Sequence, residues 1–440
     1  MFAGATQAQL TTVKKAMSRL TMSFITSLAW LVVVLFSGAA HAAKTEEVFK
    51  LYKDRLLQVR IIDKSTNSKS TIGSGFYVDN NGTIATNYHV ISKHVFKPEQ
   101  YRIEYFTQDN KTYPADLIYI DVVHDLALLS GSLADTPSFK ILESGIEKGV
   151  RIYTLGNPLD LGMTIVEGTY NGLTDDTMHE RILLSSALNS GMSGGPSING
   201  DGDIIGVNVA TAGNSIGFLV PAKFLGKLIA EAKAHKDEKD FLKIIQQQLI
   251  DNQKRYMDSL LSTPIMTKKL GPYTAPAKLA DYITCWGDSK DADGTYTKSS
   301  SYCATKNDIF LNSRLSTGEI KYIHTFLETE IMDSFRFAAL MQSYFEDPSA
   351  SFSGHKEDFT EYQCKTDYIK HADIKFKVAF CLREYKKLEG IYDMILNAAT
   401  LTENNRGIVT SLGLSGVSYE NAVNFSKHYL ESFAWKRPSL

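Results

Sequence analysis

Short apolar segments separated by turn residues fill residues 57–220 and restrict the folds this chain can adopt. Leu57, Val59 and Ile61 alternate with polar residues, which is the period of a half-buried strand. The segments 73–78 and 82–86 are joined through Asn-Asn-Gly, a hairpin signal. The other expected strands are 101–106, 112–120, 126–129, 151–155, 163–169, 181–186, 197–198, 204–210 and 217–220. Many short strands with scarcely any helix predict an all-β sandwich or a pair of barrels.

A glycine-rich turn surrounds Ser193 within this strand-rich region. Gly191, Gly194 and Gly195 leave the turn poor in side chains, so it can expose the serine hydroxyl. The same turn can direct the backbone N–H groups of Gly191 and Ser193 to one point in space. Acyl transfer requires a nucleophile beside such preset oxyanion donors. Because glycine-rich turns are common, the prediction depends on a histidine and a carboxylate elsewhere.

Both groups lie upstream of the turn. His89 ends a predicted strand at a turn, and Asp125 stands immediately before a buried apolar strand. In a catalytic triad Ser193 would attack the carbonyl carbon, and His89 would take its proton and deliver it to the leaving amine. Asp125 would hold the imidazole tautomer and stabilise the imidazolium. We expect His94 to be a surface residue and His124 to point away from the site.

The order His, Asp, Ser and the surrounding motifs resemble the trypsin-like serine proteases, and most of all their bacterial HtrA (DegP-like) branch. The motifs are Thr-Asn-Tyr-His-Val at 86–90, Asp-Leu-Ala-Leu-Leu at 125–129, Gly-Asn-Pro at 156–158, Gly-Met-Ser-Gly-Gly-Pro at 191–196 and Ile-Gly-Phe-Leu-Val-Pro at 216–221. The resemblance covers about residues 50–232. It implies an all-β chymotrypsin-like double β-barrel with the triad between the barrels, and a serine endopeptidase acting on proteins or peptides.

The sequence departs from the family pattern in two places, and the first of them, Met192, leaves an alternative function open. Position 192 is Met, where the family usually has Asn or Asp. An acid there pairs with a newly cut N-terminus in the trypsins, so Met192 disfavours activation by N-terminal insertion. HtrA proteins usually carry a C-terminal PDZ domain, and none is recognisable in this sequence. The alternative is a catalytically silent binding or chaperone-like protein on a protease fold.

By the same resemblance, the primary substrate pocket has walls from two segments. Its residues would be Ala187, Leu188, Asn189, Asn208, Val209 and Ala210. None of them is acidic, so a Lys or Arg side chain would enter without a counter-charge, at a cost of about several kcal/mol. Apolar walls made shallow by Leu188 predict cleavage after small or medium aliphatic residues.

Residues 1–42 have the pattern of an export signal. Three basic residues precede an apolar run at 24–36, which is too short to span a bilayer comfortably. Ala40-His41-Ala42 then matches a signal peptidase site. We expect a periplasmic or secreted protein with no stable membrane insertion after cleavage. An uncleaved anchor holding the same domain at the outer surface of the membrane is the alternative.

The remaining chain predicts three further parts: a protease domain at 43–235 closed by a helix at 222–234, a connecting helix within 236–270, and a smaller α+β domain at 271–440. In an exported protein the four cysteines favour two disulfides, and closeness in sequence predicts Cys285–Cys303 and Cys364–Cys381.

Nothing in the composition or the motifs indicates a metal or other cofactor. The sequence has no Cys-x-x-Cys pair and no Cys/His cluster of the kind that binds zinc. The net charge of −2 offers no electrostatic case for binding nucleic acid. Whether the chain forms a homo-oligomer is left open.

Overall fold

The computed structural model describes residues 44–142, 145–213, 215–291, 294–347, 349–401 and 405–435. The predicted export signal at 1–42 lies outside these ranges. Internal contacts divide the chain into two units, Met1–Tyr52 and Lys53–Leu440. Of the first unit, helix α2 (Lys44–Tyr52) is described. No helix among the described residues is long and apolar enough to cross a membrane.

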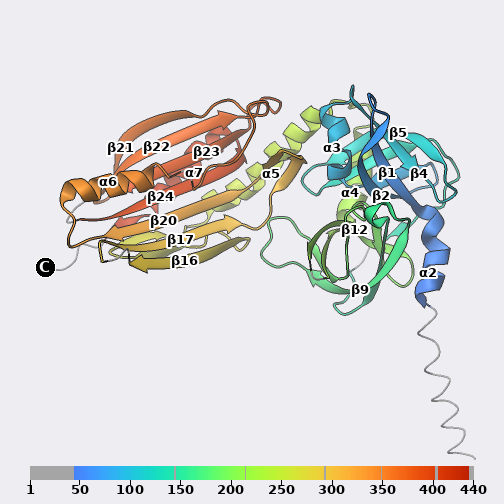
Figure 1. The fold of residues 1–440 in the computed structure, drawn as a ribbon, viewed down its shortest axis with the longest axis horizontal. Coiled ribbons are helices and arrows are strands. Elements are labelled where there is room, and N and C mark those ends of the chain that lie inside the picture. The colour runs from blue at the N-terminus through green and yellow to red at the C-terminus, as the bar shows by residue number, and fades with distance from the viewer. Residues whose placement is uncertain are drawn as a thin grey trace, which may run out of the picture. The chain divides into compact units, whose positions relative to one another are not determined.

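Six antiparallel strands close into a first barrel, in the order β1-β2-β3-β6-β5-β4 (Figure 1). After a short 3-10 helix (Lys53–Arg55), the strands are β1 (Leu56–Asp63), β2 (Ser68–Tyr77), β3 (Thr83–Thr86), β4 (Tyr101–Phe106), β5 (Thr112–Asp121) and β6 (Leu126–Gly131). Ile61, Phe76 and Leu129 are among the side chains fully buried inside. The alternation of apolar and polar residues therefore predicted the strands of this barrel correctly.

Helix α3 (Tyr88–Phe96) follows β3 where the sequence predicted only a turn. Asn87 precedes it in an extended conformation, and Val90 and Ile91 are buried. β-Branched residues of this kind are enriched in strands, which conceals the helix in the sequence. Packing of one face on the barrel stabilises it, because tertiary contacts decide the fate of so short a helix.

A second barrel of six antiparallel strands follows, in the order β11-β8-β9-β10-β13-β12, and the β11–β12 pairing closes it. Its strands are β8 (Arg151–Gly156), β9 (Thr164–Leu173), β10 (Ile182–Ser185), β11 (Pro196–Ile198), β12 (Asp203–Gly213) and β13 (Ile216–Pro221). A short strand, β7 (Lys140–Ile141), adds to β12 in parallel, and a 3-10 helix (Pro158–Asp160) follows β8. The predicted double β-barrel is thus confirmed. Helix α4 (Ala222–Ala234) has the predicted bounds.

The C-terminal part is α+β, as predicted, and is built on an antiparallel sheet in the order β16-β17-β20-β24-β23-β22-β21 (Figure 1). These strands are β16 (Ile283–Asp291), β17 (Thr297–Thr305), β20 (Ile320–Glu328), β21 (Gln363–His371), β22 (Ile374–Glu384), β23 (Tyr392–Thr400) and β24 (Arg406–Val417). Two smaller sheets accompany it: β14 (Thr267–Leu270) with β15 (Tyr273–Pro276) and β25 (Ala434–Trp435), and the hairpin of β18 (Ile309–Asn312) and β19 (Leu315–Thr317).

Helices cover both faces of the large sheet. Helices α5 (Phe241–Ser262) and α7 (Tyr419–Glu431) share a core with Leu412 and Leu414 of β24. Helix α6 (Ser334–Phe345) packs on Val409 of the same strand, which faces the opposite way because side chains alternate along a strand. Since α5 buries Met257 and Leu260 in the C-terminal core, the predicted connecting helix is also a part of that domain.

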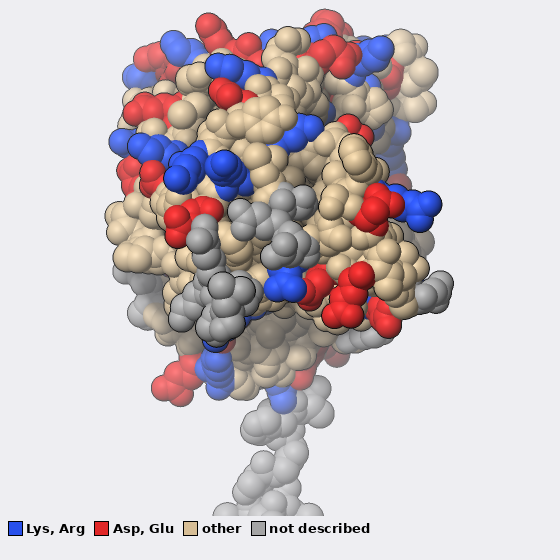
Figure 2. All heavy atoms as spheres, turned by 90° about the vertical axis from the view of Figure 1, so that its left-hand side faces the viewer, with Lys and Arg blue, Asp and Glu red and all other residues tan. Residues whose placement is uncertain are grey.

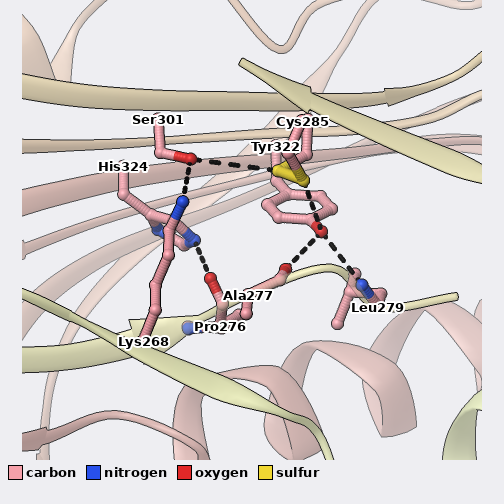
Figure 3. Close-up of a disulfide and its surroundings, with 9 residues drawn as sticks. Lys268, Pro276, Ala277, Leu279, Cys285, Ser301, Tyr322 and His324 are labelled. Atoms are coloured by element: carbon pink, nitrogen blue, oxygen red, sulfur yellow. Dashed lines mark hydrogen bonds between the residues drawn. A yellow bond between two sulfur atoms is a disulfide. The ribbon is translucent and has the colours of Figure 1, made fainter. Parts of the chain in front are cut away.

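Both predicted disulfides are present, Cys285–Cys303 and Cys364–Cys381. Each joins directly opposed residues of an antiparallel hairpin, with Cα atoms 4.0 Å apart. Figure 3 shows the ring of Tyr322 beside the first bridge, its hydroxyl 2.6 Å from the Ala277 carbonyl and 3.1 Å from the Leu279 amide. This contact fixes the chain entering β16 to the middle of the sheet.

The face drawn in Figure 2 carries Lys and Arg side chains interspersed with Asp and Glu. The C-terminal domain has ion pairs that include Arg314–Glu357 at 3.0 Å and Arg406–Glu328 at 2.9 Å. Within these pairs, charges of opposite sign therefore offset one another locally.

Candidate active site

Asp125 and His89 form a close, doubly bonded pair. The Asp125 carboxylate accepts a hydrogen bond from the His89 backbone N–H at 2.8 Å, and its other oxygen lies 2.6 Å from His89 Nδ1. Asp125 adopts φ +61°, a left-handed conformation that Asp tolerates better than most residues. Its carbonyl also accepts from the Asn87 side chain at 2.8 Å. The pair is therefore fixed from both the backbone and the side chain of Asp125.

The His89 side chain is 28% accessible, whereas the Asp125 side chain is 12% accessible. Burial favours the neutral imidazole and lowers the pKa of His89. The Asp125 charge and its hydrogen bond act in the opposite direction, and together they raise that pKa above the ordinary 6.5. The residue thus remains able to take up a proton near neutral pH.

The turn carrying Ser193 contacts the segment that precedes His89. Gly191 and Gly194 have φ of +94° and +86°, conformations that glycine adopts without strain. A Cβ on Gly194 would collide with the Ser74 carbonyl and the Thr86 hydroxyl, so only glycine allows this approach. The structure therefore brings Ser193 of the second barrel next to the His89 segment of the first.

Ser193 itself is half-buried, and its hydroxyl donates to the Val209 carbonyl at 3.4 Å. Within the described part of the chain, this hydroxyl makes no hydrogen bond to His89 Nε2. Catalytic hydrogen bonds are often loose in ligand-free structures and tighten when substrate binds. Ser193 and His89 therefore lie on adjoining segments without a hydrogen bond between their side chains.

The backbone N–H groups of Gly191 and Ser193 have no acceptor among the described residues. The carbonyl groups around them are occupied. Ser190 O accepts from the Leu159 amide at 2.8 Å, and Ser193 O accepts from the Ser74 amide at 2.7 Å. The two N–H groups that the sequence predicted as oxyanion donors therefore have no hydrogen-bond partner within the described part of the chain.

Met192 is buried, with 1% exposure, in a cluster that includes Ile152, Leu184 and Leu219 of the second barrel. Its carbonyl accepts from the Gly195 amide at 3.1 Å. An acidic side chain at position 192 would need a charged partner, whereas the Met192 side chain is held by apolar packing. The turn therefore has a fixed anchor despite the departure from the family pattern.

The residues predicted to wall the substrate pocket are divided between surface and interior. Ala187 and Asn189 are exposed, and Val209 is half-buried. Leu188 is 7% exposed and lies so close to Gly217 that a Cβ there would be 2.7 Å from it. Asn208 is fully buried. Ala210 lies in β12, and its side chain is outside the described part.

The Asn208 side chain is engaged in the interior. It donates to the Leu155 and Met192 carbonyls at 2.9 and 3.2 Å and accepts from the Ser197 hydroxyl at 2.8 Å. Because these bonds satisfy the amide, it supports the Ser193 turn from behind instead of meeting a substrate. The sequence could not distinguish these two uses of a buried polar residue.

The other histidines near the site have different partners. His94 lies on α3, not on a turn, and its Nδ1 is 2.9 Å from the Tyr101 carbonyl. His124 lies on a turn, where its Nδ1 is 2.6 Å from the Asp121 carboxylate and its ring stacks on Phe224. Among the described residues, no group of three or more His, Cys, Asp or Glu side chains could hold a metal ion.

Three side chains that the sequence analysis did not single out also contact this site. Ser74 contacts the Ser193 turn, Tyr88 precedes His89, and Phe310 of the C-terminal domain lies beside the His89 ring. The position of Tyr88 inside the His89 motif could have marked it. Ser74 and Phe310 carry no such signal, because their partners are remote in sequence.

Comparison with known proteins assigns this region to a family. Residues 73–207, which include His89, Asp125 and Ser193, match the family model of a trypsin-like peptidase domain. The chain contains a trypsin-like peptidase domain. This peptidase domain is similar to the mitochondrial serine protease HTRA2 of Drosophila pseudoobscura pseudoobscura, with 31% identity over 177 residues that cover 38% of this chain and 40% of that protein.

The peptidase domain is also 30% identical over 178 residues to a Chlamydia pneumoniae protein named as a probable periplasmic serine endoprotease, DegP-like, covering 38% of this chain and 35% of that one. A solved serine endoprotease from Yersinia pestis shares 24% identity with a TM-score of 0.37, over 43% of this chain and 66% of that one. The chain thus spans about two fifths of the length of the curated relatives it matches.

Proposed function

We propose that this protein is a serine endopeptidase in which Ser193, His89 and Asp125 act as a catalytic triad. The paired hydrogen bonds from Asp125 to the His89 backbone and imidazole carry the proposal. They fix the ring with Nδ1 bonded to the carboxylate, which leaves Nε2 as the basic nitrogen. The match to a trypsin-like peptidase domain over the same residues supports it.

The reaction follows from these positions. Ser193 Oγ leaves the Val209 carbonyl by rotation about χ1, transfers its proton to His89 Nε2 and attacks the peptide carbonyl carbon. The Gly191 and Ser193 N–H groups stabilise the oxyanion that forms. His89 then protonates the leaving amine as the C–N bond breaks. Water, deprotonated by His89, attacks the acyl carbon; the bond to Ser193 Oγ then breaks, and His89 returns the proton to that oxygen as the acid product leaves.

For the substrate, we propose proteins or peptides cut after small or medium aliphatic residues. Val209 and the exposed Ala187 offer uncharged walls, and Leu188 fills the space beside Gly217. Without an acidic residue among these positions, a buried Lys or Arg would be uncompensated. A peptide library with products identified by mass spectrometry tests this preference. Dominant cleavage after Arg, Lys or Glu would contradict it.

For its location, we propose export to the periplasm or the medium. Two disulfides in the C-terminal domain support an oxidising compartment, and residues 1–42 have the pattern of an export signal. A membrane anchor retained at residues 24–36 would place the same domains outside the membrane. N-terminal sequencing of the exported protein distinguishes the two forms, because a cleaved protein begins near Ala43.

The decisive experiment is labelling with a fluorophosphonate probe, since reaction requires both an activated serine and available oxyanion donors. We expect the wild-type protein to be labelled and to cleave peptides. Ser193→Ala should abolish labelling and lower turnover by about 10⁴-fold or more. Ser190→Ala, in the same turn, is the matched control and should retain both.

The bond from Ser193 to Val209 favours a second candidate, a silent binding or chaperone-like protein on the protease fold. A folded wild-type protein that is neither labelled nor active would support this alternative. Ordinary peptidase activity in Ser193→Ala would instead show that the wrong nucleophile has been assigned.

A further inference from the structure

The β18–β19 hairpin of the C-terminal domain contacts the helix that carries His89. The Tyr88 hydroxyl donates to the Leu311 carbonyl at 2.8 Å, across 223 residues of sequence. Both residues are fully buried, so this hydrogen bond is shielded from water. A second contact supports the junction, since Lys387 lies 5.6 Å above the ring of Phe96 at the end of α3.

Buried hydrogen bonds attach the β18–β19 hairpin to the rest of the C-terminal domain. Thr317, at the end of β19, is 2.8 Å from the Tyr385 hydroxyl, which in turn lies 2.7 Å from the Asp393 carboxylate. Asp393 is itself bound by two nitrogens of Arg383 at 2.7 and 3.0 Å. Such a satisfied buried network fixes side chains in one arrangement. The hairpin therefore presents a defined surface to α3.

Along β18 the side chains alternate between interior and surface. Ile309 and Leu311 are 3% and 0% exposed, whereas Phe310 between them is only half-buried. The Phe310 ring meets the His89 imidazole edge to face, with centroids 6.1 Å apart and planes at 79°. An apolar ring from another domain thus stands directly beside the proposed general base.

We propose that Phe310 is a specificity-determining residue that forms one wall of the substrate cleft. The inference rests on the proposed function. A general base must come within hydrogen-bond reach of the reacting atoms. Because Phe310 lies beside the His89 ring, it is also close to the substrate residues next to the scissile bond. Phe310 offers apolar area to one of the two substrate residues that flank the residue in the primary pocket. An aromatic or large aliphatic side chain would gain most from this contact.

The C-terminal domain would then complete the active site instead of serving only as an appendage. Ile309 and Leu311 would not form part of the cleft wall, because their side chains are buried in packing. The expected signature is selective: loss of the Phe310 ring should weaken substrates that present a large apolar side chain at the flanking position and spare those with glycine there.

The test is the kcat/KM of the full chain and its variants on a peptide series with Gly, Ala, Leu or Phe at each flanking position. For Phe310→Ala we expect about a 10-fold loss on the Leu and Phe peptides at one position, with the Gly peptide changed less than about 2-fold. Phe310→Leu should lie between. Phe335→Ala is the matched control, because that ring is 91% exposed on α6.

The outcomes separate the possible roles. An equal loss on all peptides, with a displaced pH profile, would mean that Phe310 positions His89, and the proposal would be wrong. Unchanged kcat/KM throughout would also refute it. If the wild-type protein neither cleaves peptides nor reacts with the fluorophosphonate, the proposed function fails first and this inference falls with it. Circular dichroism on each variant confirms that the comparison is between folded proteins.

Discussion

The Ser74 hydroxyl donates a hydrogen bond to the Gly191 carbonyl at 2.8 Å, across 117 residues of sequence. The same hydroxyl accepts from the Asn157 amide at 2.9 Å, and the Ser74 amide donates to Ser193 O at 2.7 Å. A single serine on β2 of the first barrel thus holds two positions of the turn in the second barrel, Gly191 and Ser193. The spacing of the nucleophile from the base depends on this link between barrels.

Ser74→Ala should therefore impair both activity and stability. Losing the hydroxyl leaves Gly191 O and the Asn157 N–H without their partner in a buried site, which costs about 1–3 kcal/mol of unfolding free energy. Since Gly191 is a proposed oxyanion donor, we expect kcat/KM to fall by about 10-fold or more. Urea unfolding and peptide hydrolysis measure the two effects.

Ser68→Ala is the control for this change, because Ser68 lies on the same strand and, among the described residues, its side chain donates to the exposed Thr66 carbonyl alone. It should behave as the wild type. Full activity in Ser74→Ala would show that the backbone hydrogen bond to Ser193 alone suffices to hold the turn.

Met192 gives a prediction on how the turn is stabilised. Replacement by Asp would bury a carboxylate in the described apolar cluster around Met192, at a cost of several kcal/mol where the charge is not paired. Met192→Leu keeps the volume and should cost less than about 1.5 kcal/mol. Urea unfolding of the two variants compares them. A Met192→Asp protein as stable as the wild type would mean that a hidden partner accepts the charge.

The strands and the proposed triad could be predicted from the sequence because their signals are local. Alternation marks β1 within a few residues, and each of His89, Asp125 and Ser193 lies in its own short motif. The disulfides were predictable for a similar reason, since 18 and 17 residues separate the paired cysteines. Closeness in sequence limits the hairpins that can bring them together.

Contacts made by the fold as a whole could not be predicted. No local pattern distinguishes Ser74 from other strand serines, and the Tyr88–Leu311 bond joins parts of the chain that no motif connects. Helix α3 was missed because its β-branched residues resemble a strand. Asn208 was placed on the pocket wall by resemblance, whereas three hydrogen bonds direct its amide inward.

The two disulfides should differ in their reaction with reductant. In the first bridge Cys303 is fully buried and Cys285, on the edge strand β16, is half-buried, whereas in the second Cys364 is exposed on the edge strand β21 and Cys381 is half-buried. Because thiol–disulfide exchange requires access to a sulfur atom, Cys364–Cys381 should open first in mild dithiothreitol without denaturant. Timed alkylation followed by peptide mapping measures the order. Faster labelling of Cys285 and Cys303 would contradict the burial that the structure assigns to that bridge.

The pH dependence of activity should report the environment of His89. Burial lowers the pKa of His89, but the Asp125 charge and hydrogen bond outweigh it, so the net pKa lies above 6.5. A general base must be neutral, and kcat/KM should therefore rise with pH and reach half its maximum above pH 6.5. Asp125→Asn removes both raising influences and leaves burial, so its midpoint should move to lower pH, with turnover reduced by about 10⁴-fold.

Stability should change with pH in the opposite direction from activity. Since the folded pKa of His89 is raised, its contribution to stability is fully present below the unfolded value near 6.5. That contribution is lost as pH rises through the folded pKa, the same interval in which the neutral base appears and hydrolysis begins. Urea unfolding measures the free energy of unfolding of the wild type and of Asp125→Asn at matched pH values. The difference between the two proteins gives the contribution of the His89–Asp125 pair. A difference that grows with pH across this interval would show that Asp125 does not favour the imidazolium, and an activity midpoint at or below 6.5 would show that the influence of Asp125 does not outweigh burial.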